Sequence, residues 1–180
     1  IFAQNTDMLR DYFPRCKNVS LVPRGVDTDE FLNRPNDTKL MHKYNITTHE
    51  KVILTVANLV PVKGIEILLD AFQALSHDSV SVRLLIVGDK DNDYGWEMEK
   101  KASQSALLEK IHFTGKVQDV KNYYSIADVF VLPTQAQGEG SPVSLLEAMA
   151  SNIPVIASNT FGTNDILGNI SDHLYAPNDA

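Results

Sequence analysis

Short apolar runs rich in β-branched residues recur along the chain. They lie at residues 52–56, 82–87, 111–114, 128–132 and 154–157. Because each run is four to six residues long and lacks polar alternation, we predict strands of a parallel sheet that are covered on both faces.

Helical periodicity fills the segments between these runs. Apolar residues at i, i+3, i+4, i+7 and i+10, beginning at Ile65, form one stripe of a helix over about residues 63–76. A more polar helix is predicted over 94–108 and a third over 142–151, with Asn152 in the left-handed conformation just beyond it. This alternation of strand and helix predicts an α/β fold with a doubly wound parallel sheet.

The chain divides into one regular region and a short irregular start. Its 180 residues and 20.0 kDa suit one ordinary domain. Residues 28–180 carry the alternation and are interpreted as one Rossmann-like domain. Residues 1–27 fit the alternation less well, with a short helix expected over 6–13 and a strand over 19–22. We interpret residues 1–27 as a lead-in segment from an N-terminal domain that the chain does not include.

Charge and cysteine content exclude several classes of function. Sixteen basic and 23 acidic residues give a net charge of −7, which argues against a nucleic-acid partner. The single cysteine, Cys16, excludes an internal disulfide and a cysteine-rich metal site, and it fits a reducing compartment. The five histidines lack the spacing of metal ligands. We therefore predict no metal site, and any anionic ligand must be held by local groups.

Sequence motifs for other functions of α/β folds are absent or incomplete in this chain. The fingerprints GxGxxG, GxxxxGK[ST] and GxSxG are absent, which argues against dehydrogenases, P-loop enzymes and α/β-hydrolases. A calcium loop beginning at Asp89 also fails, because Tyr94 stands where glycine is needed and Lys100 stands where the closing glutamate is needed. The function must therefore be sought elsewhere in the chain.

The most informative segment is 138–150, which follows the strand predicted at 128–132. The glycines beside Glu139 let backbone amides approach a ligand closely. Ser141 is expected to cap the next helix, whose N-terminus offers free amides to a phosphate. Glu147 lies about a turn and a half inside that helix, and its carboxylate suits sugar hydroxyls rather than phosphate. Ligands bind at the carboxyl ends of strands in open α/β sheets, so this segment is a candidate site.

A second loop, 57–64, follows the first strong strand and contains Asn58 and Lys63. Lys63 precedes a predicted helix, which is the unfavourable end of the helix dipole for a cation. An anionic ligand between Lys63 and the helix N-termini accounts for this placement. The two loops together therefore predict one anion-binding site.

The ordered set of motifs resembles the C-terminal, nucleotide-sugar-binding half of GT-B glycosyltransferases, in particular the large retaining family 4, also called group 1. The resemblance covers nearly the whole chain from residue 22. Its segments are 22–27 with Phe31, 60–64, 85–89, 113–117, 127–133, and Glu139-x7-Glu147 followed by 154–157. Each segment is weak alone, and their order makes the resemblance specific.

The resemblance implies two catalytic residues, Lys63 and Glu139. Lys63 would neutralise the donor diphosphate in place of a metal ion, and Glu139 would contact the transferred sugar near the reacting carbon. Glu147 would bind the ribose hydroxyls. The other implied donor-binding residues are Gly140, Ser141 and Pro142 in the turn near sugar and phosphate, Gly115, Lys116 and Val117 in a turn facing the base, and Asn58.

As a whole, the resemblance implies a metal-independent hexosyltransferase that uses a UDP-, GDP- or ADP-sugar, needs no cofactor and retains the anomeric configuration. It also implies an N-terminal acceptor domain, without which the isolated chain is inactive or nearly so. The expected setting is polysaccharide biosynthesis in the cytoplasm. The N-terminal acceptor domain is expected to associate peripherally with the inner face of the membrane.

Two departures from the family pattern leave alternatives open. The family usually has arginine where this chain has Asn58, and the segment between Pro133 and Glu139 is two residues longer than the common form. A non-catalytic nucleotide-sugar-binding subunit and half of a GT-B-type epimerase are the alternative functions.

Overall fold

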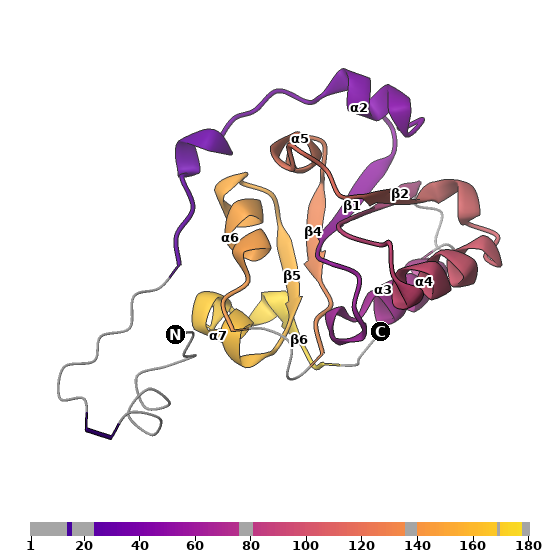
Figure 1. The fold of residues 1–180 in the computed structure, drawn as a ribbon. Helices are drawn as coiled ribbons and strands as arrows, with labels where there is room; N and C mark the ends of the chain where they lie inside the picture. Colours follow the sequence, from indigo (N-terminus) through magenta and orange to yellow (C-terminus); the bar gives the residue numbers. More distant parts are fainter. Residues whose placement is uncertain (1–13, 16–23, 76–80, 136–139, 169, 178–180) are drawn as a thin grey trace.

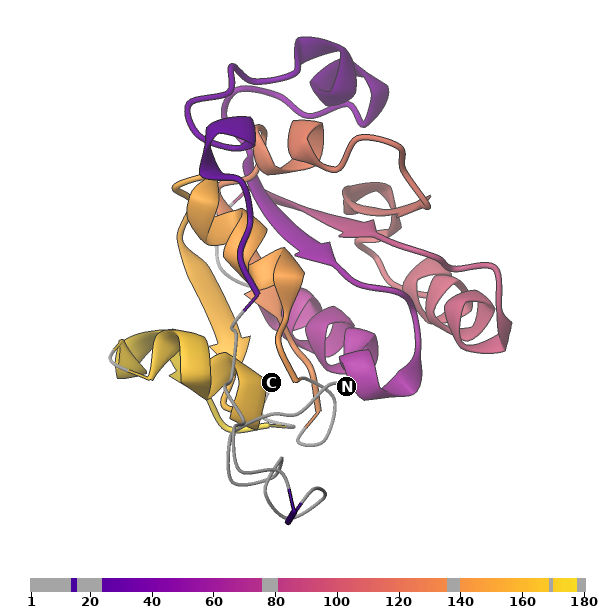
Figure 2. The same ribbon diagram turned by 60° about the vertical axis from the view of Figure 1, so that its left-hand side comes forward.

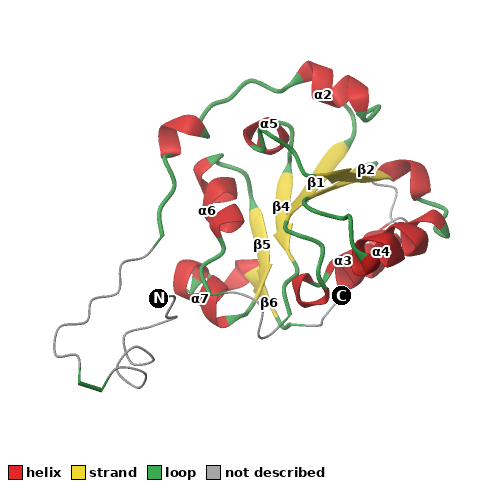
Figure 3. Ribbon diagram, viewed as in Figure 1, coloured by secondary structure: helices red, strands yellow, loops and turns green. Residues whose placement is uncertain are grey.

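The computed structural model describes residues 14–15, 24–75, 81–135, 140–168 and 170–177. Within these ranges the chain alternates strands and helices (Figures 1 and 3). The strands are β1 (Lys51–Val56), β2 (Val82–Val87), β3 (Ile111–Gly115), β4 (Val129–Leu132), β5 (Val155–Ser158) and β6 (Leu174–Tyr175). The α-helices are α2 (Thr38–Lys43), α3 (Ile65–Leu75), α4 (Asp93–Ser103), α5 (Lys121–Tyr124), α6 (Val143–Ala150) and α7 (Phe161–Leu167). Short 3-10 helices are η1 (Thr28–Glu30), η2 (Pro61–Lys63), η3 (Leu108–Lys110) and η4 (Ser171–His173).

The six strands form one sheet in the order β3-β2-β1-β4-β5-β6, and every pair is parallel. The chain first adds strands outward on one side of β1, then returns to add β4, β5 and β6 on the other side. The order therefore reverses between β1 and β4, which makes this the topological switch point of a doubly wound sheet. The predicted α/β fold with a doubly wound, Rossmann-like sheet is confirmed.

Helices on the two sides of the sheet bury two separate cores. On one face, α3 and α4 pack on β1 and β2, with Leu69, Phe72 and Met98 in the core. On the other face, α5 and α6 cover the sheet, with Tyr124 and Leu145 in the core. Figures 1 and 2 show α3 beside α4 on one side of the sheet and α6 on the other. The strand order reverses between β1 and β4, so the crossover helices lie on opposite faces on the two sides of this point.

Most predicted elements agree with the structure, and the largest difference concerns the second helix. The α4 helix ends at Ser103, whereas the pattern predicted a helix to residue 108. Asn92 begins α4 by accepting a hydrogen bond from Gly95 N at 3.0 Å. The expected helix at 6–13 and strand at 19–22 lie outside the described residues, and the boundary at residue 27 stays a prediction.

The prediction that Ser141 caps α6 is wrong. Pro142 occupies the N-cap position in an extended conformation, with φ −72° and ψ 103°, and no side chain caps the helix there. Ser141 therefore lies one residue before the N-cap position. At the other end Asn152 has φ 58°, as predicted, and its N–H donates to Met149 O at 3.0 Å. Asparagine tolerates this left-handed position at the end of a helix.

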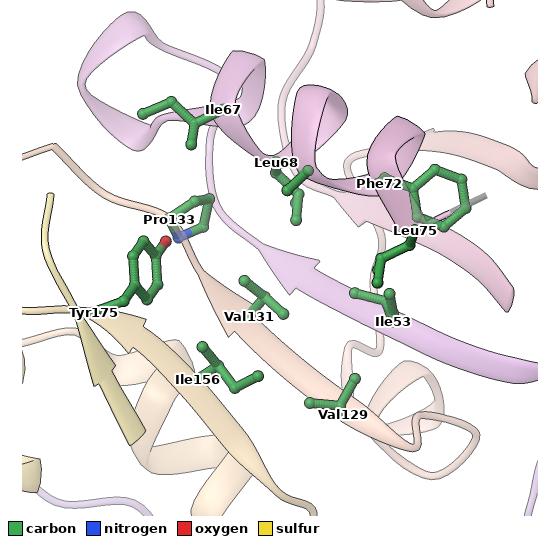
Figure 4. Close-up of a pocket in the computed structure, with 11 residues that line it drawn as sticks. Ile53, Ile67, Leu68, Phe72, Leu75, Val129, Val131, Pro133, Ile156 and Tyr175 are labelled. Carbon is green, nitrogen blue, oxygen red and sulfur yellow. The ribbon is translucent and has the colours of Figure 1, made fainter. Parts of the chain in front are cut away.

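Among the described residues, the face of the sheet on the side of α3 is only partly covered near β5, contrary to the prediction that the strands are covered on both faces. Apolar side chains from α3 and from β1, β4, β5 and β6 line a cavity of about 490 Å³ there. Figure 4 shows Val131 and Ile156 facing this space, with Leu68 and Phe72 of α3 beside it. Ile156 is 43% exposed although it lies within a strand. The helices α6 and α7 lie on the opposite face, so none of the described helices covers β5 here.

The open face predicts unequal costs for two neighbouring substitutions in β5. Val155 is buried against the α6 core, whereas Ile156 faces the cavity. We expect Val155→Ala to lower the free energy of unfolding by about 2 kcal/mol and Ile156→Ala by less than about 1 kcal/mol. Urea unfolding of both variants measures the difference, and equal losses would contradict an open face.

Among the described helices, none is both long and apolar enough to cross a membrane.

Candidate functional site

The candidate site lies where the loops after β1 and β4 meet, at the carboxyl side of the switch point. The loop after β1 carries Asn58 and Lys63, and the loop after β4 leads into α6. In open α/β sheets, the crevice at the switch point is the usual ligand-binding position. The topology therefore brings together the two loops that the sequence analysis selected independently.

Two contacts join these loops directly. The Gln135 N–H donates to Val62 O at 2.8 Å. Gly64 has φ +66°, and a Cβ built on it would lie 1.9 Å from Pro133 O. Only glycine allows the backbone both this left-handed conformation and this approach. The position of Lys63, the residue before Gly64, is therefore fixed relative to the loop after β4.

Lys63 is the last residue of η2, and α3 begins two residues later at Ile65. The prediction that Lys63 precedes this helix is confirmed, with Gly64 as an intervening left-handed residue. Glu66 lies in the first turn of α3, where an acidic side chain suits the helix dipole. The side chain of Lys63 is half-buried.

Asn58 is exposed on a loop whose backbone is well anchored. The next residue, Leu59, is buried, and its N–H donates to Asp89 O at 2.8 Å. On the other side of Asn58, the Ala57 N–H donates to Val87 O at 2.9 Å. The loop therefore holds Asn58 at the carboxyl edge of β1 with its side chain toward solvent.

Glu147 is half-buried on α6 and contacts a tyrosine from α5. Tyr124 Oη lies 2.9 Å from Glu147 Oε2 and 3.0 Å from Ser144 O. Burial raises the pKa of Glu147, and the hydrogen bond from Tyr124 and the charge of Lys121 lower it by less. Burial and the nearby carboxylate raise the pKa of Tyr124, which keeps the phenol protonated. The sequence analysis missed Tyr124, because the contact joins residues from separate helices.

The turn after β3 has the left-handed conformation that its glycine allows. Gly115 has φ +72°, and the exposed Lys116 forms an ion pair with Asp89 at 2.7 Å. Val117 packs on the same core as α6. In the order β3-β2-β1-β4, this turn is two strand spacings from β1 and three from β4, the strands of the switch point, or roughly 9 to 14 Å. A ligand that contacts both places must be extended across the carboxyl edge of the sheet.

The N-terminal end of α6 contains three other predicted binding residues. Gly140 and Ser141 are exposed, and Pro142 is buried at the N-cap. The first amides of a helix have no partner within the helix, and no side chain caps α6, so this end suits an anionic group. Glu139, the predicted catalytic carboxylate, lies outside the described residues.

Buried hydroxyl groups anchor the start of the loop after β4. Ser158 Oγ lies within hydrogen-bond distance of two backbone oxygens, Leu132 O at 3.3 Å and Thr134 O. Both Thr134 and Ser158 are completely buried. Together with the Gln135 bond, these contacts fix the backbone that leads toward the site. The described residues contain no cluster of three or more His, Cys, Asp or Glu that could hold a metal ion.

Comparison with known proteins identifies the family. Residues 36–180 match the model of the glycosyl transferases group 1. The chain belongs to the group 1 glycosyltransferases. One relative is the GDP-mannose-dependent alpha-(1-6)-phosphatidylinositol monomannoside mannosyltransferase of Mycobacterium tuberculosis, with 29% identity over 157 residues, 83% of this chain and 40% of that protein. The chain spans 35 to 40% of the length of such curated relatives.

Solved structures show the same fold. A glycosyltransferase from Rickettsia africae superposes with a TM-score of 0.78 and 26% identity, over 87% of this chain and 42% of that chain. Anabaena HepE, solved in complex with UDP-glucose, superposes with a TM-score of 0.74 and 23% identity, over 85% of this chain and 42% of that chain. The domain therefore has the Rossmann-like architecture of these GT-B glycosyltransferases.

Proposed function

We propose that this group 1 glycosyltransferase domain binds a nucleoside diphosphate sugar at the switch point. Within the whole protein that contains it, the domain transfers the hexose to a hydroxyl acceptor with retention of anomeric configuration. The observation that carries the proposal is the junction of two loops, in which Gly64 packs on Pro133 and places Lys63 beside the segment leading to α6. The setting we propose is polysaccharide biosynthesis, with the acceptor bound by the remainder of the protein.

The proposed chemistry assigns separate roles to the two loops. Lys63 and the amides at the start of α6 hold the diphosphate, whose negative charge increases as the sugar–phosphate bond breaks. Glu139 contacts the sugar near the reacting carbon, and Glu147 accepts hydrogen bonds from the ribose. The turn at Gly115 faces the base. No metal ion is required in this mechanism, because Lys63 and the helix N-terminus supply the positive charge.

Calorimetric titration tests the donor site. UDP-glucose, GDP-mannose and ADP-glucose are titrated into the chain in buffer with EDTA. We expect one of them to bind with millimolar or better affinity, and Glu147→Ala to weaken that binding. If none of the three binds, the donor-site proposal is wrong. Binding that appears only when magnesium replaces EDTA would contradict the role proposed for Lys63.

Asn58 supports one alternative, a subunit that binds nucleotide sugar without transferring it. Arginine usually occupies this position in the family, and the exposed Asn58 supplies no positive charge. The whole protein is assayed for sugar transfer and for donor hydrolysis. Binding without either reaction would favour the non-catalytic subunit.

Replacing Asn58 by arginine should strengthen donor binding. The loop is anchored at Ala57 and Leu59, so a longer cationic side chain can reach the diphosphate without moving the backbone. We expect Asn58→Arg to lower the Kd for the bound nucleotide sugar about three- to tenfold, through a charge-assisted contact. Asn58→Gln, which lengthens the side chain without adding charge, is the matched control. Unchanged affinity in Asn58→Arg would show that the diphosphate does not lie near this loop.

A further inference from the structure

The contact between Tyr124 and Glu147 links two helices at the candidate site. Tyr124 is completely buried, and its ring packs against Phe31 and Phe130, each at a centroid distance of 5.9 Å. Its hydroxyl lies within hydrogen-bond distance of a carboxylate oxygen and of a backbone carbonyl on α6. The packing of the ring therefore fixes the position of the hydroxyl relative to Glu147.

A count of protons shows that this contact can take two forms. A phenol has one hydrogen to donate, and here two oxygens lie close to it. When Glu147 is ionised, the phenol donates to the carboxylate, because a charged acceptor gives the stronger bond. When Glu147 is protonated, its O–H donates to Tyr124 Oη, and Tyr124 donates to Ser144 O at 3.0 Å. In both forms Oε2 stays bound to Tyr124.

We infer that Tyr124 is a positioning residue of the donor site, which holds Glu147 Oε2 and thereby turns the other carboxylate oxygen, Oε1, toward the ribose hydroxyls. This inference rests on the proposed function. Tyr124 does not touch the ligand, since its hydroxyl contacts Glu147 and Ser144 of α6 and its ring is packed in the hydrophobic core. Its effect is exerted through the orientation and the charge of Glu147.

The charge of Glu147 makes this role measurable as a pH dependence. An ionised Glu147 accepts from both ribose hydroxyls, whereas a protonated carboxyl loses acceptor capacity. Burial raises the pKa of Glu147, and the bond from Tyr124 opposes that increase. Lys121 also lowers this pKa and is itself paired with Glu30 at 2.9 Å. Loss of the Tyr124 hydroxyl therefore raises the pKa of Glu147 further, so donor binding fails at a higher pH than in the wild type.

The test is Tyr124→Phe, which keeps the buried ring and removes only the hydroxyl. Nucleotide-sugar affinity is measured by calorimetry from about pH 5 to about pH 8. The probes are UDP-glucose, GDP-mannose and ADP-glucose, because a diphosphate esterified at both ends lacks the secondary phosphate ionisation that would confuse the profile in this range. We expect the midpoint for loss of binding to rise by about one pH unit, and the Kd on the high-pH plateau to rise about three- to tenfold.

Tyr123→Phe is the matched control. Tyr123 lies on the same helix and is also buried, but its hydroxyl contacts Tyr44 Oη at 3.1 Å. We expect this variant to keep the wild-type pH profile. Glu147→Gln is the second control. Its amide does not titrate, so this variant should show no such midpoint, and adding Tyr124→Phe to it should not introduce one.

The outcomes separate this inference from the proposed function. If the wild type binds none of the three probes at any pH, the proposed function fails and the inference fails with it. If the wild type binds and Tyr124→Phe has the same midpoint and plateau, the inference is overturned while the donor site stands. NMR titration of the Glu147 carboxyl without ligand gives an independent measurement, and an unchanged pKa in a folded Tyr124→Phe variant would also overturn the inference.

Discussion

Lys63→Ala should lower kcat/KM for sugar transfer by the whole protein by roughly 10²- to 10³-fold. The diphosphate gains negative charge as the bond to the sugar breaks, so a cation beside it stabilises the transition state more than the bound donor. The net charge of the chain is −7, which opposes an anionic ligand, and local positive groups must overcome that repulsion. The measurement is steady-state kinetics with the donor identified by calorimetry.

Two further variants control the Lys63 experiment. Lys100→Ala removes an exposed lysine on α4 and reproduces the change in net charge at a different place. We expect its kcat/KM to stay within about twofold of wild type, because exposed charges far from the site are screened by salt. Lys63→Arg retains the charge with a different shape and should recover part of the lost activity. Equal activity in Lys63→Ala and wild type would remove Lys63 from the mechanism.

The strands were predictable because local composition decides them. The run 82–87 became β2 without change, since five of its six residues are apolar and Gly88 follows it. Which faces of the sheet are covered by helices was not predictable from local composition. Ile156 lies in an apolar run that looks buried, yet its exposure depends on which helices pack over β5. Burial of this kind is a property of the tertiary arrangement.

The site was predicted in part, for a related reason. The loop at Lys63 and the segment at Glu147 each carry a local signal, and the switch-point topology joins them. The contact of Tyr124 with Glu147 spans 23 residues and depends on how α5 packs against α6, so no local pattern indicates it. The capping error at Ser141 had a local cause: the backbone of Pro142 is extended, and the helix begins one residue later.

Gly64→Ala should be among the most damaging single substitutions in the chain. A Cβ at Gly64 would lie 1.9 Å from Pro133 O, which is backbone and cannot turn away as a side chain would. The left-handed φ of +66° adds a second penalty for any residue with a Cβ. We expect a loss of about 3–4 kcal/mol in the free energy of unfolding, measured by urea denaturation with an unchanged m-value.

Gly115 and Gly25 separate the two contributions to this loss. Gly115 has a similar φ of +72°, but a Cβ there meets only Lys90 Cε at 3.8 Å. Gly115→Ala should therefore lower the free energy of unfolding by only about 1 kcal/mol, because only the left-handed backbone conformation is unfavourable for alanine there. A Cβ on Gly25 would meet nothing within 4 Å, so Gly25→Ala should be close to neutral.

The same substitution connects stability to function, because the contact at Gly64 is one of the two contacts that join the loops of the site. If the protein relieves the clash by moving the loop after β1 away from Pro133, Lys63 moves with it. Donor affinity in the folded fraction of Gly64→Ala should then fall at least about tenfold, as expected when a charge-assisted contact is lost. A Gly64→Ala variant that is destabilised yet binds the donor with wild-type affinity would show that the junction supports the fold without positioning Lys63.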